Sequence, residues 1–103
     1  MKIKLNKQPL VTSINRVQGA ISERSLAQIA IKTNSDGVLL AANDRVLAVY
    51  SQLDCEVQTK GVVFLPAKLF SDVVKELPDS DITIEQIESN VLITASEGSH
   101  FQM

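Results

Sequence analysis

The chain has 103 residues, of which 45% are hydrophobic, and a formal net charge of −2 at pH 7. This length and apolar content suit one domain with a packed core. The mildly acidic balance excludes a domain that grips nucleic acid by charge alone, because counterion release needs clustered Lys and Arg. The lone Cys55 excludes an internal disulfide and fits a reducing compartment. Without an apolar run of membrane-spanning length or a signal-peptide pattern, we expect a soluble, cytoplasmic protein.

The first half of the chain predicts a strand, a helix and three more strands. Residues 1–6 alternate as a strand, and Pro9 then stands in the first turn of a helix. Residues 22–25 are predicted to form a polar loop around Arg24. Strands are predicted over 26–33, 38–42 and 46–53, with a hairpin turn at 34–37. The apolar face of the helix is predicted to comprise Leu10, Val11, Ile14, Val17 and Ile21.

The second half repeats this order of elements. A strand over 62–65 leads into a helix that starts at Pro66 and ends before Pro78-Asp79. Strands over 82–87, 91–95 and 99–103 follow. The helix is predicted to bury Leu69, Phe70, Val73, Val74 and Leu77. Its exposed face is predicted to hold Lys68, Ser71, Asp72, Lys75 and Glu76.

The apolar residues of the two halves correspond position by position. Leu5, Leu10, Ile14 and Val17 recur as Leu65, Phe70, Val74 and Leu77, and Ile29, Ile31, Val38 and Leu40 recur as Ile82, Ile84, Val91 and Ile93. We interpret this as an internal duplication covering about 1–53 and 60–103. The predicted class is α+β, a duplicated β-α-β-β-β unit. Because the matched stripes must share one core, we expect two helices side by side on one face, backed by antiparallel sheets.

Residues for catalysis are sparse. A nucleophilic pair of Cys55 and His100 would need a coincidence of folding, since the two lie far apart in sequence. The four glycines form no phosphate-binding loop. The cluster Asp79, Asp81 and Glu85 is read as a helix end and solvated strand faces, not as a metal site. We predict no enzyme activity, no metal and no cofactor. Most of the aromatic residues, Tyr50, Phe64, Phe70 and Phe101, are expected in the core.

Three basic residues are candidates for nucleic-acid contact. Arg24 lies in a short polar loop after an amphipathic helix, where it is either a solvated surface residue or a phosphate contact. Lys68 and Lys75 are seven residues apart and share a helix face, with Asp72 between them. A solvated, salt-bridged face is the alternative for these two lysines.

Residues 99–103 form a strand with nothing after it to cover its edge. A strand that ends a domain is usually paired, covered or charged. We therefore expect the chain to be a piece of a longer protein.

Several motifs carry a resemblance to a known family. They are Met1-Lys2-Ile3-Lys4, the helix with Ile14-Asn15-Arg16-Val17, the Arg24 loop, Val63-Phe64-Leu65-Pro66-Ala67-Lys68-Leu69-Phe70, and Lys75-Glu76-Leu77-Pro78. Over its whole length the chain resembles the N-terminal domain of the bacterial sliding clamp, the beta subunit of DNA polymerase III. It departs from the family pattern at Ser25–Ile29 and at Asn43–Val46.

The resemblance implies a non-catalytic processivity factor of bacterial DNA replication. Three such domains would form a protomer, and two protomers would close head to tail into a ring around double-stranded DNA. The ring would tether the replicative polymerase by raising its effective concentration. Polymerase and clamp loader would dock on later domains, and no cofactor or membrane is implied.

The resemblance also implies roles for particular residues. Arg24, Lys68 and Lys75 would face the DNA, whereas His100 and Phe101 would lie at the joint between protomers. A different class of function stays open beside this one, namely a small non-enzymatic protein-interaction module with a similar duplicated fold. A gene that continues for two further domains would favour the clamp, and a natural stop after Met103 would favour the module.

Overall fold

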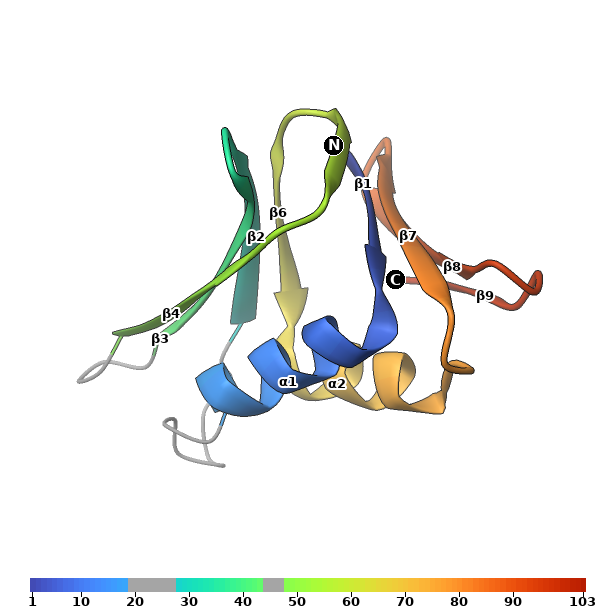
Figure 1. The fold of residues 1–103 in the computed structure, drawn as a ribbon, viewed down its shortest axis with the longest axis horizontal. Helices are drawn as coiled ribbons and strands as arrows, with labels where there is room; N and C mark the ends of the chain where they lie inside the picture. Colours follow the sequence, from blue (N-terminus) through green and yellow to red (C-terminus); the bar gives the residue numbers. More distant parts are fainter. Residues whose placement is uncertain (19–27, 44–47) are drawn as a thin grey trace.

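The computed structural model describes residues 1–18, 28–43 and 48–103, in which two helices lie side by side beneath two antiparallel sheets (Figure 1). The helices are α1 (Lys7–Gln18) and α2 (Ala67–Glu76). The strands of the first half are β1 (Lys2–Asn6), β2 (Gln28–Asn34), β3 (Gly37–Asn43) and β4 (Ala48–Leu53). Those that follow are β5 (Glu56–Thr59), β6 (Val62–Pro66), β7 (Asp81–Ile87), β8 (Asn90–Ala95) and β9 (His100–Gln102). The predicted α+β class and the side-by-side helices are confirmed.

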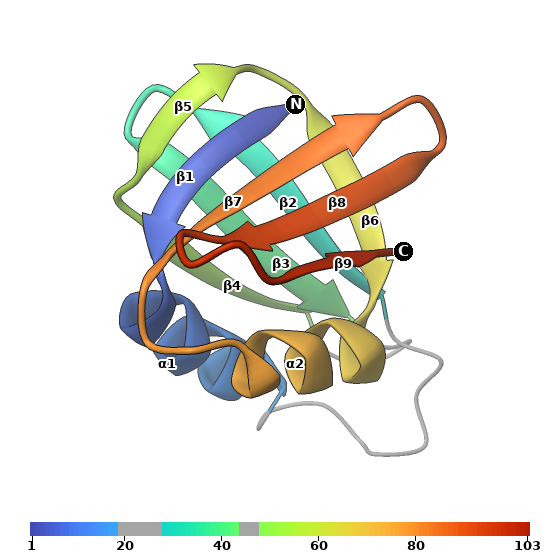
Figure 2. The ribbon, with the colours of Figure 1, turned by 90° about the vertical axis from the view of Figure 1, so that its right-hand side faces the viewer.

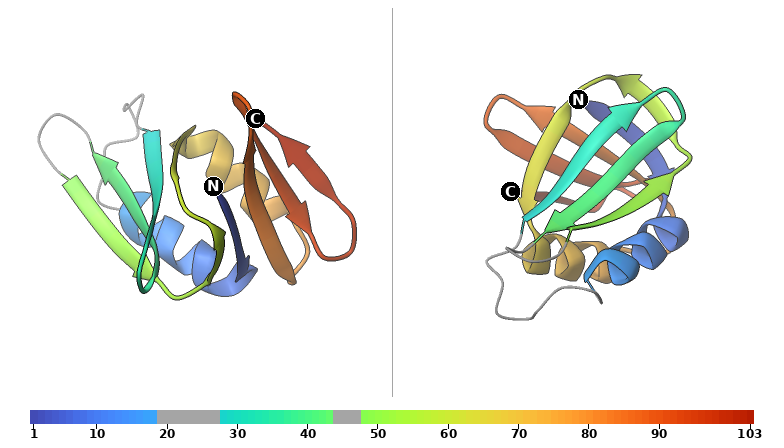
Figure 3. Two further views of the ribbon diagram at one scale, coloured as in Figure 1. Left: turned by 90° about the horizontal axis from the view of Figure 1, so that it is seen from above. Right: turned by 90° about the vertical axis from the view of Figure 1, so that its left-hand side faces the viewer.

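The two halves of the chain exchange their first strands. One sheet has the order β5-β1-β7-β8-β9 and the other the order β4-β3-β2-β6 (Figures 2 and 3). Strand β1 therefore pairs with the strands of the second half, and β6 pairs with those of the first. Neither half can separate without breaking both sheets, so the duplicated units form one domain around one core.

Strand register repeats between the halves. Leu5 of β1 pairs with Ile82, and the repeat-related Leu65 of β6 pairs with Ile29. Ile31 opposes Leu40 across β2 and β3, in the same way as Ile84 opposes Ile93 across β7 and β8. Because a one-residue slip would turn every inward side chain outward, this matched register keeps both apolar sets on the core side.

The predicted repeat positions all lie in a single hydrophobic core. Leu10 and Phe70, which correspond in the two helices, are both fully buried, as are Ile29 and Ile82 in the strands. Each such side chain contributes about 1.5–3 kcal/mol relative to an exposed position. The shared core is thus the physical basis of the duplicated pattern.

The predicted buried face of α2 is wrong at its two margins. Leu69, expected inside, is 50% exposed, and Ser71, expected outside, is only 2% exposed. The buried arc of the helix is centred on Phe70 and Val74, and it extends to the side of Ser71. A small side chain such as Ser71 permits close packing there, whereas helical period alone does not define where an arc ends.

The expectation that most aromatic residues are buried is also wrong. Phe70 is fully buried, but Tyr50 and Phe64 are each 62% exposed and Phe101 is 40% exposed. In β6 the neighbours Val63 and Leu65 point inward, so strand alternation turns Phe64 outward. Tyr50 lies outward in β4 for the same reason, between Val49 and the buried Ser51.

Strand β5 was not predicted. Only Val57 of its four residues is partly buried, so the segment has no apolar alternation to reveal it. Its strand conformation comes from pairing with β1, where the register shifts between Lys2 and Ile3. A tertiary contact therefore creates an element that local sequence does not indicate.

The two helices begin and end differently. The side-chain oxygen of Asn6 accepts a hydrogen bond of 3.0 Å from the amide of Gln8, which caps the start of α1. Helix α2 starts after Pro66, which makes no side-chain cap. The Lys7 ammonium donates to the carbonyl oxygens of Lys75 (3.1 Å) and Leu77 at the end of α2. This contact sets the start of α1 beside the end of α2, so the helices are antiparallel (Figure 3).

Candidate functional site

The outer surface of the helix pair is the first candidate site. Helix α1 buries Leu10, Ile14 and Val17, and α2 buries Phe70 and Val74, so the opposite sides of both helices face solvent. The exposed side chains there are Gln8, Thr12, Asn15 and Arg16 of α1 and Lys68, Leu69, Asp72, Lys75 and Glu76 of α2. We call this set of side chains the helix surface. It holds three cations and two carboxylates, which gives a local excess of positive charge on an acidic chain.

Two of the three predicted basic candidates lie on the helix surface. Lys68 and Lys75 are both exposed on α2, two helical turns apart. Asp72 and Glu76 are exposed beside them, as predicted for both residues. Arg24 lies outside the described residues.

Arg16 of the helix surface makes a contact with β4 that the sequence did not reveal. Its Nη1 donates to the hydroxyl oxygen of Ser51 in β4 over 3.4 Å. The Ser51 hydroxyl donates in turn to Ser13 Oγ over 3.0 Å, and both serines are buried. Neither serine is recognisable as a site residue from the sequence, because the two are 38 residues apart. One feature of the sequence could have indicated this contact. It is a polar residue at an inward position of a strand whose other inward residues are apolar.

The edge strand β9 is the second candidate site. It lies at one end of its sheet, next to β8, with its other side unpaired in the described residues. Phe101 is 40% exposed although it pairs with the fully buried Ile93. His100 is exposed, and its Nδ1 lies 3.4 Å from the carbonyl oxygen of Gly98. Phe101 is therefore partly exposed beside an open strand edge, and its role as an interface residue stays a prediction.

A nucleophile pair of Cys55 and His100, expected only by a coincidence of folding, does not fit the topology. Cys55 immediately precedes β5, and His100 is in β9, at the opposite edge of the same sheet. Four strand spacings of about 4.8 Å separate these edges by about 19 Å. Partial burial and the nearby Asp54 carboxylate also raise the pKa of the Cys55 thiol, which disfavours the reactive thiolate.

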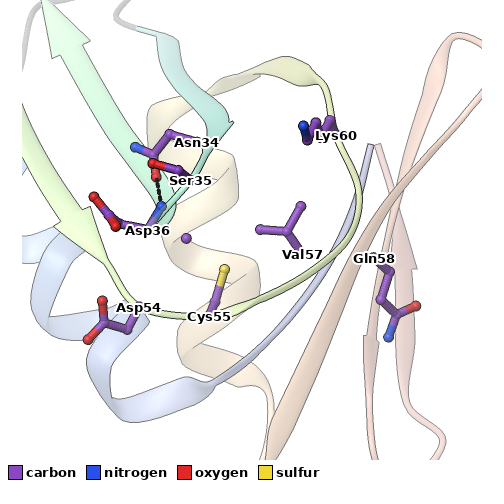
Figure 4. Close-up of a pocket in the computed structure, with 9 residues that line it drawn as sticks. Asn34, Ser35, Asp36, Asp54, Cys55, Val57, Gln58 and Lys60 are labelled. Carbon is purple, nitrogen blue, oxygen red and sulfur yellow. Dashed lines mark hydrogen bonds between the residues drawn. The ribbon is translucent and has the colours of Figure 1, made fainter.

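An open pocket of about 560 Å³ lies away from the helices, at the β2–β3 turn and the β4–β5 connection (Figure 4). Its walls include Asn34, Asp36, Asp54, Cys55 and Lys60. The side-chain oxygen of Asn34 accepts a 3.0 Å hydrogen bond from the Asp36 amide in the turn, and its side-chain nitrogen donates to Gln52 of β4 over 2.8 Å, so these polar groups already have partners within the protein. Within the described ranges, no group of three or more His, Cys, Asp or Glu residues could hold a metal ion. Among those same residues, no helix is long and apolar enough to cross a membrane.

Comparisons with known proteins agree with this geometry. Residues 1–103 match the family described as DNA polymerase III beta subunit, N-terminal domain. The chain is 30% identical to the beta sliding clamp of Synechocystis sp. and 29% identical to that of Bacillus subtilis, each over 115 aligned residues. Both alignments cover the whole chain, which spans 29% of the first relative and 30% of the second.

Solved structures give the same result. The chain is similar to the sliding clamp, DNA polymerase III subunit beta, of Bartonella birtlesii, with a TM-score of 0.91 and 29% identity. That match covers 100% of this chain and 29% of the other. A beta subunit from Streptococcus pyogenes, at 23% identity and a TM-score of 0.91, has the same fold. On the match of its full length, the chain belongs to the family of DNA polymerase III beta subunit N-terminal domains.

Proposed function

We propose that this chain is part of a sliding clamp, a ring that encircles duplex DNA and tethers the replicative polymerase in the bacterial cytoplasm. The observation that carries the proposal is the family match over residues 1–103. The ring would act as a processivity factor and catalyse nothing itself. The separation of Cys55 from His100 by a full sheet width supports a non-catalytic role.

The chain would be one domain of a longer protein. It spans 29% of the first relatives it matches, which leaves room for about two further domains of its size. We propose three domains per protomer, with residues 1–103 as the first and its internal repeats at about 1–53 and 60–103. Sequencing the complete gene tests this, because a natural stop after Met103 would instead favour a small interaction module.

DNA would be held inside the ring by topology, with the helix surface toward the duplex. Exposed Lys68 and Lys75 support this orientation, since ammonium groups on an exposed helix can approach phosphates. Arg24 joins them on the resemblance alone. The net charge of −2 and the acidic neighbours Asp72 and Glu76 favour weak contact, which suits a ring that must slide.

The protomers would meet at β9. Its open edge can extend a sheet into a neighbour, and the half-exposed Phe101 can supply apolar contact there. His100 would face acidic groups across the joint. Polymerase and clamp loader would bind later domains of the protein.

A retention experiment on circular DNA tests the proposed function. The full-length protein is loaded on nicked circular duplex, and the bound fraction is followed before and after linearisation. Retention that ends on linearisation supports encirclement, because a sliding ring leaves free ends. A protein that stays bound to linear DNA, or a 103-residue chain with salt-sensitive submicromolar affinity for linear duplex, would contradict it.

The same assay tests the basic residues. Arg24→Ala, Lys68→Gln and Lys75→Gln should each shorten retention, and Lys4→Gln, an exposed lysine on β1 away from the helix surface, serves as the control. Equal retention for a variant and the Lys4→Gln control would remove that residue from the DNA-facing set.

A further inference from the structure

We propose that Arg16 is a DNA-phosphate contact and that Ser51 positions it, an inference that rests on the proposed function. Among the described residues, no other cation of the helix surface has a side-chain anchor: Lys68 and Lys75 extend from α2 without a side-chain hydrogen bond, whereas Arg16 donates to Ser51. The ligand class is the phosphodiester backbone of duplex DNA.

The anchor of Arg16 is a fixed one. Ser51 and Ser13 are 4% and 2% exposed, and their hydroxyls are joined by a 3.0 Å hydrogen bond. The two serines also connect β4 to α1, so the acceptor offered to Arg16 belongs to the packed interior. A guanidinium held in this way loses less conformational freedom on binding than a free lysine does.

The guanidinium of Arg16 keeps most of its capacity to donate. Arginine has five N–H donors in a planar fork, and the bond to Ser51 uses one of them. The side chain is exposed, and the ion pair found among the described residues joins Lys2 and Glu85 instead. No described carboxylate therefore competes with an incoming phosphate for Arg16, and a bidentate contact is open to it.

The position of Arg16 places this contact at the same end of the helix surface as Lys68. The antiparallel helices set the end of α1 beside the start of α2 (Figure 3). Arg16 is near the end of α1 and Lys68 is near the start of α2, so both belong to the same end of the helix surface. In the repeat, Arg16 corresponds to Glu76 and Asn15 corresponds to Lys75 (16 to 76 and 15 to 75). Each helix thus carries a cation near its C-terminal end, but the two cations are one residue apart in the alignment of the repeats.

The test measures how salt weakens DNA binding in the full-length protein. Affinity for circular duplex is determined at several salt concentrations for the wild type, Arg16→Gln, Ser51→Ala and Glu76→Gln. Losing one phosphate contact lowers the slope of log K against log salt by about 0.9, which amounts to about a threefold smaller loss of affinity over a fourfold rise in salt. We expect this change for Arg16→Gln and a smaller one for Ser51→Ala.

A double variant separates positioning from packing. Ser51→Ala should reduce the slope in the wild-type background and leave it unchanged in the Arg16→Gln background, because Ser51 acts through Arg16. Arg16→Lys should keep part of the slope, since it retains the charge without the fork. Glu76→Gln, the repeat-related control, should not lower the slope. Melting curves confirm that each variant is folded at the assay temperature.

The outcomes distinguish this inference from the function on which it rests. If the wild type is retained on circular DNA and Arg16→Gln has the wild-type slope, the phosphate contact is refuted while the clamp function stands. If Ser51→Ala changes the slope equally in both backgrounds, the positioning role is refuted. If the wild type is not retained on circular DNA, both the proposed function and this inference fail.

Discussion

The two halves of the domain have the same core and different surfaces. Buried positions correspond closely, such as Leu10 with Phe70 and Ile31 with Ile84. Repeat-related positions at the margins of the core and on the surface have diverged in chemistry: Asn6 with Pro66, Lys7 with Ala67, Arg16 with Glu76, Gly37 with Asn90, and Ser51 with Phe101. A shared core constrains apolar side chains at fixed register, whereas solvent accepts many side chains. The differences between the halves are therefore where function can be specialised.

Helix ends illustrate the point. In the first half, Asn6 caps the start of α1 and Lys7 reaches the end of α2. The corresponding Pro66 has no capping side chain, and Ala67 has no ammonium group with which to return the contact. One half thus supplies a cap for the other, which ties the two repeats together at one end of the helix pair.

The largest predicted effect concerns Gly37, where the second half has Asn90. Gly37 has a φ of 132°, and a Cβ there would lie 2.2 Å from the carbonyl oxygen of Leu53. Gly37→Ala should therefore combine backbone strain of about 1–3 kcal/mol with overpacking of about 1–3 kcal/mol. Urea unfolding monitored by circular dichroism measures the loss.

Gly98→Ala is the matched control for this change. Gly98 also has a positive φ, of 110°, but no atom lies within 4 Å of the added Cβ. Gly98→Ala should lower the free energy of unfolding by the backbone strain alone, about 1–3 kcal/mol. Equal destabilisation by the two variants would show that the close approach of Leu53 has no energetic weight.

The edge strands provide the second comparison. Ser51 and Phe101 are both inward positions on edge strands, but Ser51 is 4% exposed and Phe101 is 40% exposed. The substitution Phe101→Ser gives β9 the serine that β4 has at the corresponding position, Ser51. If β9 is an interface, self-association of the chain should weaken by about 1–2 kcal/mol, or at least about fivefold. Sedimentation equilibrium measures this change.

Tyr50→Ser is the control for the edge-strand prediction, because Tyr50 is equally aromatic and more exposed but faces the outer side of β4. Its removal should leave self-association unchanged. An equal effect of both substitutions would indicate non-specific association through exposed apolar side chains and would count against an interface at β9.

A smaller effect is expected at Lys7. Lys7→Met removes the hydrogen bonds to the carbonyl oxygens of Lys75 and Leu77 while keeping the length of the side chain. A partly exposed cap of this kind should contribute about 1 kcal/mol. Thermal unfolding measures the loss, with Lys4→Met as a control for the removed charge. The capping role is wrong if both variants melt at the same temperature.

The smallest effect concerns Cys55, in a connection that has no counterpart in the second half. Burial and Asp54 raise the pKa of its thiol above the ordinary value of 9.0. A raised pKa keeps the thiol protonated to higher pH, so alkylation of the folded chain should accelerate only above the pH at which the urea-unfolded chain reacts. Identical pH profiles for the folded and unfolded chains would contradict this. Asp54→Asn should shift the folded profile part of the way back.

The sequence by itself determined the duplicated core. Apolar spacing at Leu10, Ile14 and Val17, with its recurrence at Phe70, Val74 and Leu77, predicted both helices and their shared buried face. Strand alternation predicted most of the sheet, and the family motifs predicted the fold. These features can be predicted because burial imposes a periodic spacing of apolar residues on each helix and strand. That spacing is visible in the sequence without knowing which element packs against it.

The tertiary structure alone decided the features that depend on distant partners. Strand exchange and the existence of β5 depend on which strands pair. The Arg16–Ser51–Ser13 contact joins residues from α1 and β4 that have no local relation in sequence. Hydrogen bonds between single side chains impose no period, so only the folded arrangement can bring them together and place a fixed cation on the helix surface.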